Sequence, residues 1–114
     1  MEGGTLMGWE YGIRTTNPVI LPRIVKRLAD SLTFSDLYKL EHYEDGFALL
    51  QEDSSWPEAL QVSIEVASGM DEIVEGELYI YCLFHTWGDI AANWLRQMEA
   101  AANQEDTELE WFEL

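Results

Sequence analysis

The stretch that decides the fold is residues 77–87, ELYIYCLFHTW. Apolar or aromatic side chains occupy nearly every position, although successive residues of a strand point to opposite faces of a sheet. A segment that is apolar on both faces is typical of a central strand with neighbours on both sides. We therefore predict a strand at the heart of a sheet. One face holds Leu78, Ile80, Cys82 and Phe84, and the other holds Tyr79, Tyr81, Leu83 and His85.

Three further segments alternate apolar and polar residues, as half-buried strands do. The clearest alternation is in residues 60–66, LQVSIEV. Residues 9–15, WEYGIRT, predict a first strand, and residues 107–114 predict a last strand in which Leu109 and Trp111 alternate with acids. The sheet therefore draws strands from both ends of the chain.

A hairpin is predicted between the first helix and residue 60. Residues 38–44 and 47–53 are short strand-like runs joined by Asp45-Gly46, a two-residue signal for a type I′ turn. Residues 68–76 form an acidic, glycine-bounded connection that is either a long hairpin loop or contains a short helical turn. The pattern leaves both shapes open.

Two amphipathic helices are predicted from apolar residues at helical spacing. The first spans residues 21–32, with Pro22 tolerated in its first turn. The second begins near Thr86, which resembles an N-terminal cap, and runs to about residue 103. The outer face of the first helix carries Arg23, Lys26 and Arg27.

The resulting order is β-α-β-β-β-β-α-β, in which each helix sits between two strands and acts as a crossover on the same sheet face. We predict an α+β two-layer sandwich, with a mostly antiparallel sheet of about six strands and two helices on one face. This plan resembles a ferredoxin-like β-α-β-β-α-β topology with an extra hairpin, a likeness that carries no activity. Residues 1–8 are predicted to be a flexible N-terminal leader, and residues 9–114 a single domain.

The chain carries 22 acidic and six basic side chains among 114 residues, a formal net charge of -16. Charge of this sign repels the phosphates of nucleic acids and anionic lipid head groups, so direct binding to DNA, RNA or a membrane is disfavoured. The acid is unevenly placed. Residues 1–39 hold five basic and four acidic side chains, whereas residues 40–114 hold one basic and 18 acidic ones.

The single cysteine, Cys82, lies in an apolar run and has no partner for an intramolecular disulfide. A lone thiol of this kind fits a reducing compartment, and we expect the protein in the cytoplasm. Cys82 and His85 point to opposite faces of a strand, which disfavours a thiolate and base pair. A buried structural thiol is the favoured interpretation.

Other candidate chemistry is sparse. A zinc site would need His42, His85 and carboxylates from distant strands, and no spacing requires that arrangement. Neighbouring acids such as Asp71 and Glu72 could serve as a general acid and base, but chance pairs are expected among 22 acids. We therefore expect no catalytic residues, metal or cofactor, and an enzyme is disfavoured.

The acid and the aromatic residues instead favour an interaction protein that binds a basic protein partner. Specific versions are an inhibitor or immunity protein for a nuclease-type toxin, typically encoded beside it in bacteria, and a mimic of nucleic acid whose carboxylates imitate phosphates. Aromatic anchors are expected on the central strand, with Tyr43 or Trp111 on neighbouring strands. The predicted partner-binding residues are Glu65, Asp71, Glu72, Glu75, Glu77, Tyr79, Tyr81, Glu108 and Glu110.

Two alternatives come from other classes of protein. One is a small-molecule-binding or catalytic domain with an aromatic pocket between helices and sheet, using His42, His85 and nearby acids. The other is a self-associating structural protein, in which an open sheet face with Tyr79 and Tyr81 is buried in a homodimer. An acidic surface that serves only solubility is the plain alternative to all of these.

Overall fold

The structure, a computed structural model, describes residues 9–52, 57–70, 73–86, 88–104 and 109–114, with only the backbone of Trp9. The predicted leader, residues 1–8, lies outside the described residues. The elements in chain order are β1 (Trp9–Thr15), a short 3-10 turn (Pro18–Ile20), α1 (Leu21–Ser31), β2 (Tyr38–Tyr43), β3 (Gly46–Gln51), β4 (Glu58–Val66), β5 (Leu78–Phe84), α2 (Gly88–Ala102) and β6 (Leu109–Glu113).

The strands form one six-stranded sheet in the order β2-β3-β4-β5-β1-β6. Every neighbouring pair is antiparallel. The predicted plan is confirmed, because β1 lies between β5 and β6 while the β2–β3 hairpin extends the sheet beyond β4. The strand predicted to be central, β5, pairs with β4 on one side and β1 on the other.

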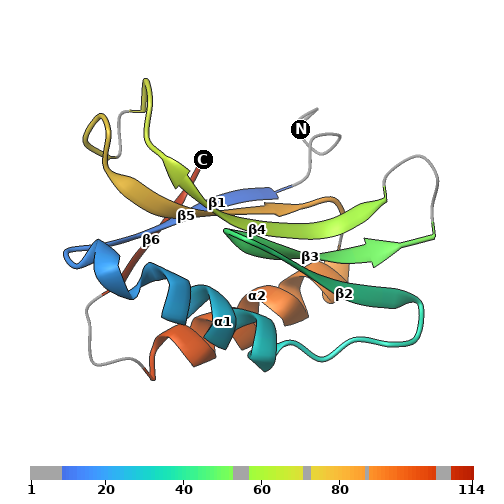
Figure 1. The fold of residues 1–114 in the computed structure, drawn as a ribbon. Helices are drawn as coiled ribbons and strands as arrows, with labels where there is room; N and C mark the ends of the chain where they lie inside the picture. Colours follow the sequence, from blue (N-terminus) through green and yellow to red (C-terminus); the bar gives the residue numbers. More distant parts are fainter. Residues whose placement is uncertain (1–8, 53–56, 71–72, 87, 105–108) are drawn as a thin grey trace.

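The molecule has two layers, with both helices beneath one face of the sheet (Figure 1). The apolar stripe of each helix meets the inward residues of the strands, because burying both surfaces together removes the most apolar area from water. Ile80, Cys82 and Phe84 of β5 are fully buried in this core, as are Leu28 of α1 and Met98 of α2. Neither described helix lies on the second face of the sheet.

The connection from α1 to β2 is fastened to α2 at Thr33. The indole Nε1–H of Trp94 donates to the Thr33 carbonyl at 3.1 Å. The side-chain amide of Gln97 accepts from the Thr33 N–H at 3.0 Å and donates to its hydroxyl at 2.6 Å. The start of β2 is therefore positioned by the second helix, which lies far along the chain.

The predicted β2–β3 hairpin forms, but the predicted turn is wrong. Tyr43 pairs with Gly46, so the two loop residues are Glu44 and Asp45. A type I′ turn needs positive φ at both loop residues, and among the described residues only Gly69, Gly76 and Gly88 have it. Gly46 is the first residue of β3, and glycine is needed there because a Cβ would lie 1.9 Å from the carbonyl oxygen of Val62.

The connection between β4 and β5 is a long hairpin loop, and its described residues contain no helix. Backbone hydrogen bonds close its base, from the Ala67 N–H to the Glu77 carbonyl at 2.8 Å and from the Gly76 N–H to the Ala67 carbonyl at 2.9 Å. Glycine suits the two bends, where φ is +68° at Gly69 and +84° at Gly76. Ile73 in the loop is buried with Tyr79 in a small second cluster. The loop thus covers part of the second sheet face.

Candidate functional site

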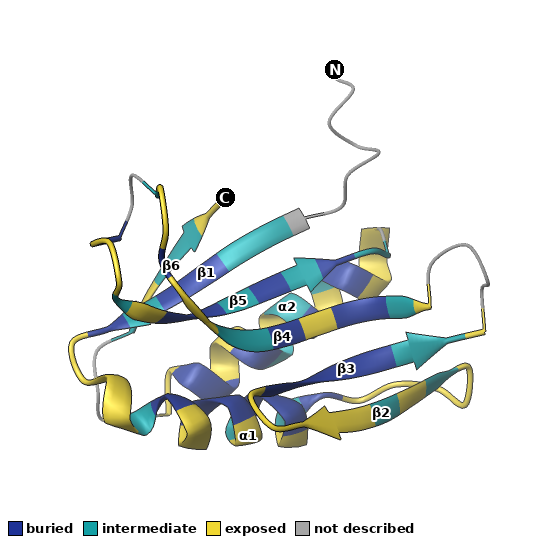
Figure 2. Cartoon of the chain, turned by 45° about the horizontal axis from the view of Figure 1, so that its top comes forward, coloured by how far each residue is buried: buried dark blue, intermediate teal, exposed yellow. Residues whose placement is uncertain are grey.

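The sheet face opposite the helices, named here the open face, is covered by neither α1 nor α2 (Figure 2). Strand alternation decides its members, because residues next to a core residue along a strand point the other way. Its described residues on the four strands away from the β2–β3 hairpin are Glu10, Gly12, Arg14, Gln61, Ser63, Glu65, Tyr79, Tyr81, Leu83, Glu110 and Phe112.

A tyrosine and a glutamate form the best-defined polar contact of the open face. The Tyr81 hydroxyl donates to the Glu10 carboxylate at 2.7 Å, from β5 to β1. Burial raises the pKa of Tyr81 well above its ordinary value, and the hydrogen bond to Glu10 and the negative charge of Glu10 raise it further. Tyr81 therefore remains a neutral donor at physiological pH and holds the Glu10 carboxylate in a fixed position.

An aromatic cluster lies beside this pair. The rings of Tyr79 and Phe112 are 6.4 Å apart between centroids, and Ile73 of the loop packs against the cluster. Gly12 makes room for Phe112, since a Cβ on Gly12 would lie 2.3 Å from the ring. Tyr79 is only 7% exposed. Its side chain is therefore covered by the loop, and the partly exposed aromatic side chains beside it are Tyr81 and Phe112.

Trp111 does not belong to this face, contrary to the suggestion from the sequence. Leu109 and Trp111 pack against the main core on the helix side. Phe112, the next residue, points to the open face because side chains alternate along β6. Tyr43 does point away from the helices, but β3 and β4 separate it from Tyr81.

Acidic side chains surround the aromatic residues. Glu65 accepts a hydrogen bond from the Ser63 hydroxyl at 2.6 Å. Glu110 forms an ion pair with Arg14, its partner across the β1–β6 register, with Nε and Oε1 3.4 Å apart. Arg14, Glu110 and Glu77 line a groove of about 650 Å³ at the end of β1. One cation therefore lies among several carboxylates.

The structure brings together some of the residues predicted to bind a partner and separates others. Glu65, Tyr81, Glu110 and the buried Tyr79 share the open face, with Glu77 at its end. Glu75 lies in the β4–β5 loop, where its carboxylate accepts from the Gly69 N–H at 2.9 Å. Predicted residues outside the described part of the chain are Asp71, Glu72 and Glu108.

The residues predicted to bind a partner did not include Glu10 or Phe112, which contribute a carboxylate and an aromatic ring to the open face. Glu10 lies out of phase with the apolar residues of β1, and Phe112 lies out of phase with Leu109 and Trp111 of β6. Alternation alone was a sufficient signal for both orientations. The Tyr81–Glu10 contact also needs the β1–β5 register, which the sequence does not reveal.

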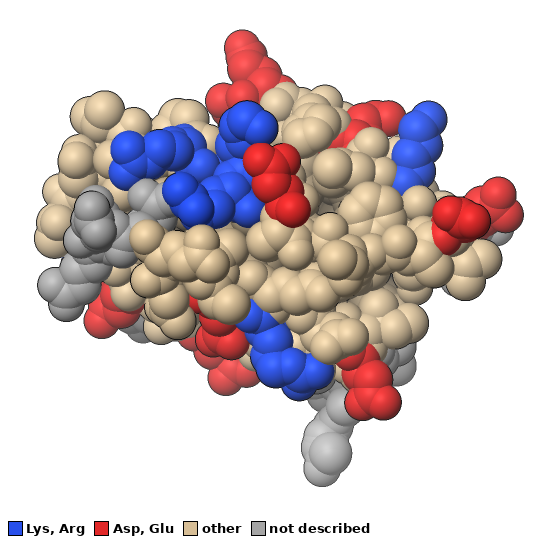
Figure 3. All heavy atoms as spheres, turned by 90° about the horizontal axis from the view of Figure 1, so that it is seen from below, with Lys and Arg blue, Asp and Glu red and all other residues tan. Residues whose placement is uncertain are grey.

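The helix layer has the opposite electrostatic character near α1. Figure 3 views this layer from below and shows Lys and Arg gathered in one area. The gathered cations of α1 are Arg23, Lys26 and Arg27, with Lys26 paired to Asp30 at 3.1 Å. The charge of the protein is therefore directional, with cations on α1 and carboxylates around the open face.

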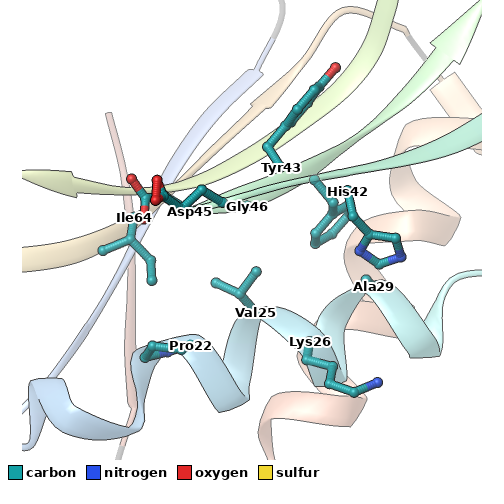
Figure 4. A pocket seen from close by; sticks show the side chains of 11 residues that line it. Pro22, Val25, Lys26, Ala29, His42, Tyr43, Asp45, Gly46 and Ile64 are labelled. Atoms are coloured by element: carbon teal, nitrogen blue, oxygen red, sulfur yellow. The ribbon is translucent and has the colours of Figure 1, made fainter.

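A pocket of about 350 Å³ lies between α1 and the β2–β3 hairpin (Figure 4). Its buried lining is apolar and includes Val25 and Phe47. Lys26 and His42 lie toward one end, while Asp45 lies toward the other. These polar side chains are all exposed at the rim, and His85 does not line the pocket. The two histidines therefore do not share this site.

His85 follows β5, where its N–H donates to the Ala59 carbonyl at 2.8 Å. Burial lowers the pKa of His85, which favours the neutral imidazole. In the described part of the chain, no group of three or more His, Cys, Asp and Glu side chains could hold a metal ion.

We predict that Cys82 is inert toward thiol reagents in the folded protein. Its side chain is fully buried in the core, and burial raises the pKa of the thiol to about 12. The reactive thiolate is therefore nearly absent at pH 8 and has no access to solvent. Ellman's reagent should label Cys82 only after urea unfolds the chain, and rapid labelling of the native protein would contradict its placement.

Comparison with known proteins finds no matching family model, no matching curated protein and no matching solved structure. None of the described helices is long and apolar enough to cross a membrane.

Proposed function

We propose that this protein binds a basic protein partner through the open face of its sheet. The observation that carries the proposal is that both helices pack on one face, so the opposite face presents carboxylates around an aromatic centre. An antiparallel sheet commonly leaves one face to solvent, and apolar side chains grouped on such a face are typical of a binding surface.

Electrostatics favours a cationic partner. Glu10, Glu65 and Glu110 lie on the face, and Arg14 neutralises part of their charge. The net charge of -16 adds a long-range field of the same sign. Such a field steers encounter with a positive surface and raises association rates toward ~10⁸ M⁻¹ s⁻¹ at low salt. It also rejects acidic competitors.

The aromatic residues supply the apolar part of the contact. Tyr81 and Phe112 are partly exposed, and the loop with Ile73 holds the cluster around them in place. Tyrosine gives a large contact area for little loss of conformational entropy, and here Glu10 already restrains its ring. Residues of this kind dominate the binding energy at the centre of many interfaces.

The finer proposal is an inhibitor or immunity protein for a nuclease-type toxin, or a mimic of nucleic acid. Enzymes that cut nucleic acids bind phosphates with cationic side chains. Carboxylates can bind those cationic side chains instead, and here they lie on strands whose neighbours are about 4.8 Å apart. A lone, fully buried thiol supports action in a reducing compartment such as the cytoplasm. Gene neighbourhood bears on this version, because toxins and their immunity proteins are encoded side by side.

The test is a comparison of two charge variants as bait in a pull-down from the native cell extract. Glu10→Gln combined with Glu65→Gln removes two charges from the open face. The control, Glu44→Gln combined with Glu99→Gln, removes two exposed charges from the hairpin turn and α2. Both baits have the same net charge, so a difference between them reports location.

We expect wild type and the control to capture the same basic protein, released by 0.5 M salt, and the open-face variant to bind it about tenfold more weakly. The affinity of the identified partner is then measured by calorimetry at two salt concentrations. Equal weakening by both double variants would attribute binding to net charge alone. Capture that survives high salt, or capture of no basic protein, would reject the proposal.

A further inference from the structure

The sheet has two edge strands, β2 and β6, which no other described strand pairs on their outer side, and their charges differ. Each edge strand presents unpaired N–H and C=O groups that can pair with another chain, and natural proteins commonly protect such edges with charge. The charged residues of β6 are Glu110 and Glu113, so a second copy would be repelled there. The charged residues of β2 are Lys39 and Glu41, which cancel. β2 lies exposed at the margin of the sheet (Figure 2).

The backbone direction of β2 follows from the hairpin. The Asp45 carbonyl accepts from the Ile64 N–H of β4 at 2.9 Å. Because backbone groups alternate in direction along a strand, the next residue, Gly46, bonds toward β2 and its partner Tyr43 bonds toward β3. The same alternation assigns Lys39 and Glu41 to bonds with β3.

Residues Tyr38, Leu40 and His42 therefore direct their backbone groups away from the sheet, to the open edge. The Tyr38 N–H is already used, since it donates to the Ser35 carbonyl at 3.1 Å. The groups left for a new strand are the Tyr38 carbonyl and the N–H and carbonyl groups of Leu40 and His42. This set is centred on Leu40.

Two antiparallel copies of β2, centred on Leu40, place matching side chains opposite each other. In an antiparallel pair centred there, Lys39 of one copy stands opposite Glu41 of the other, twice over. The next positions outward on the same face bring Leu37 opposite Tyr43, and these are 72% and 49% exposed. On the helix side, Leu40 meets Leu40. Opposite charges and exposed apolar side chains thus match at the same register.

We propose that β2 pairs with β2 of a second copy of this chain, antiparallel about Leu40, so that one sheet continues through both copies. The two Leu40 residues exchange backbone hydrogen bonds, and each His42 N–H donates to the Tyr38 carbonyl of the other copy. The two-fold axis is perpendicular to the sheet, so the helices of both copies lie on the same side of it. The open face stays uncovered, and this pairing is independent of the proposed partner.

Sedimentation equilibrium at physiological ionic strength tests the pairing. A single strand pair gives a small interface, so we expect a weak dimer with a dissociation constant somewhat below about 1 mM. The Debye length of about 8 Å at 0.15 M salt screens most repulsion between the two acidic copies but not the adjacent Lys39–Glu41 pairs. A strict monomer at about 1 mM would overturn the proposal.

Charge variants identify the register. Lys39→Glu and Glu41→Lys each place like charges opposite each other, and each should weaken the dimer roughly tenfold or more. They change the net charge in opposite directions, so a bulk charge effect cannot weaken both. The double variant restores complementarity and should dimerise like wild type. An equimolar mixture of the two single variants should form mixed dimers.

Unchanged circular dichroism and melting temperatures serve as the folding check for these exposed positions. The Glu10→Gln and Glu65→Gln variant should dimerise normally. Loss of the dimer in that variant would move the interface to the open face and overturn the proposal. Failure of the charge-swapped double variant to recover would also count against pairing about Leu40.

Discussion

Replacing Gly46 with alanine lowers the free energy of unfolding by about 3 kcal/mol or more. A Cβ at this position would lie 1.9 Å from the Val62 carbonyl oxygen and 2.8 Å from the Ser63 Cα. Both atoms are backbone of β4, which is paired on its other side with β5 and has little room to move. Urea denaturation with and without the substitution measures the loss.

Gly12→Ala is the matched control. Its Cβ would lie 2.3 Å from the nearest ring atom of Phe112, a side chain that can turn away. Neither glycine has a positive φ, so backbone strain does not separate the two substitutions. We expect Gly12→Ala to cost about 1–2 kcal/mol, chiefly in lost aromatic contact. An equal or larger cost at Gly12 would contradict the assignment of the Gly46 effect to a backbone clash.

The same glycine shows where sequence reasoning stops. Asp45-Gly46 predicts a turn because glycine adopts positive φ, and this reason alone is visible in the sequence. A second reason for glycine, close approach of another strand, depends on the pairing of β3 with β4. The hairpin was therefore predicted correctly, while its turn was displaced by one residue.

Alternation was enough to predict β1, β4 and β6, because burial of one face imposes a period of two. The helix layer followed from apolar residues at helical spacing. Alternation was also enough to orient Phe112 against Trp111, although the prediction named the wrong one of the two. The burial of Tyr79 was not predictable in this way. It depends on how the loop with Ile73 folds back over the sheet, and the sequence left that shape open.

The charges of the chain were also predictable only in part. Their sum and their bias along the chain are properties of the sequence. Which charges lie at an exposed edge depends on strand order, since β2 becomes an edge only because β1 joins β5 at the far side of the sheet. The complementarity of Lys39 and Glu41 about Leu40 acquires meaning only with that order.

Replacing Trp94 with alanine is expected to cost about 3–5 kcal/mol of unfolding free energy. The side chain is 2% exposed, and its ring meets Tyr38 edge to face at 5.0 Å between centroids. Its Nε1–H also donates to the Thr33 carbonyl. Trp94→Phe keeps one aromatic ring but removes that donor and part of the buried ring volume, and should cost about 1–2 kcal/mol. Urea denaturation of both variants measures how much of the loss a smaller aromatic ring restores.

The location of the damage distinguishes this account from a general loss of core volume. Trp94 connects α2 to Thr33 and Tyr38, so the milder Trp94→Phe variant should loosen the start of β2 before the rest of the sheet. Amide hydrogen exchange at Lys39, which bonds to β3, should then accelerate more than exchange at Ile80 in the middle of β5, because local opening needs less free energy than global unfolding. Equal acceleration at both amides would mean that Trp94 stabilises the fold as a whole and does not position the edge strand.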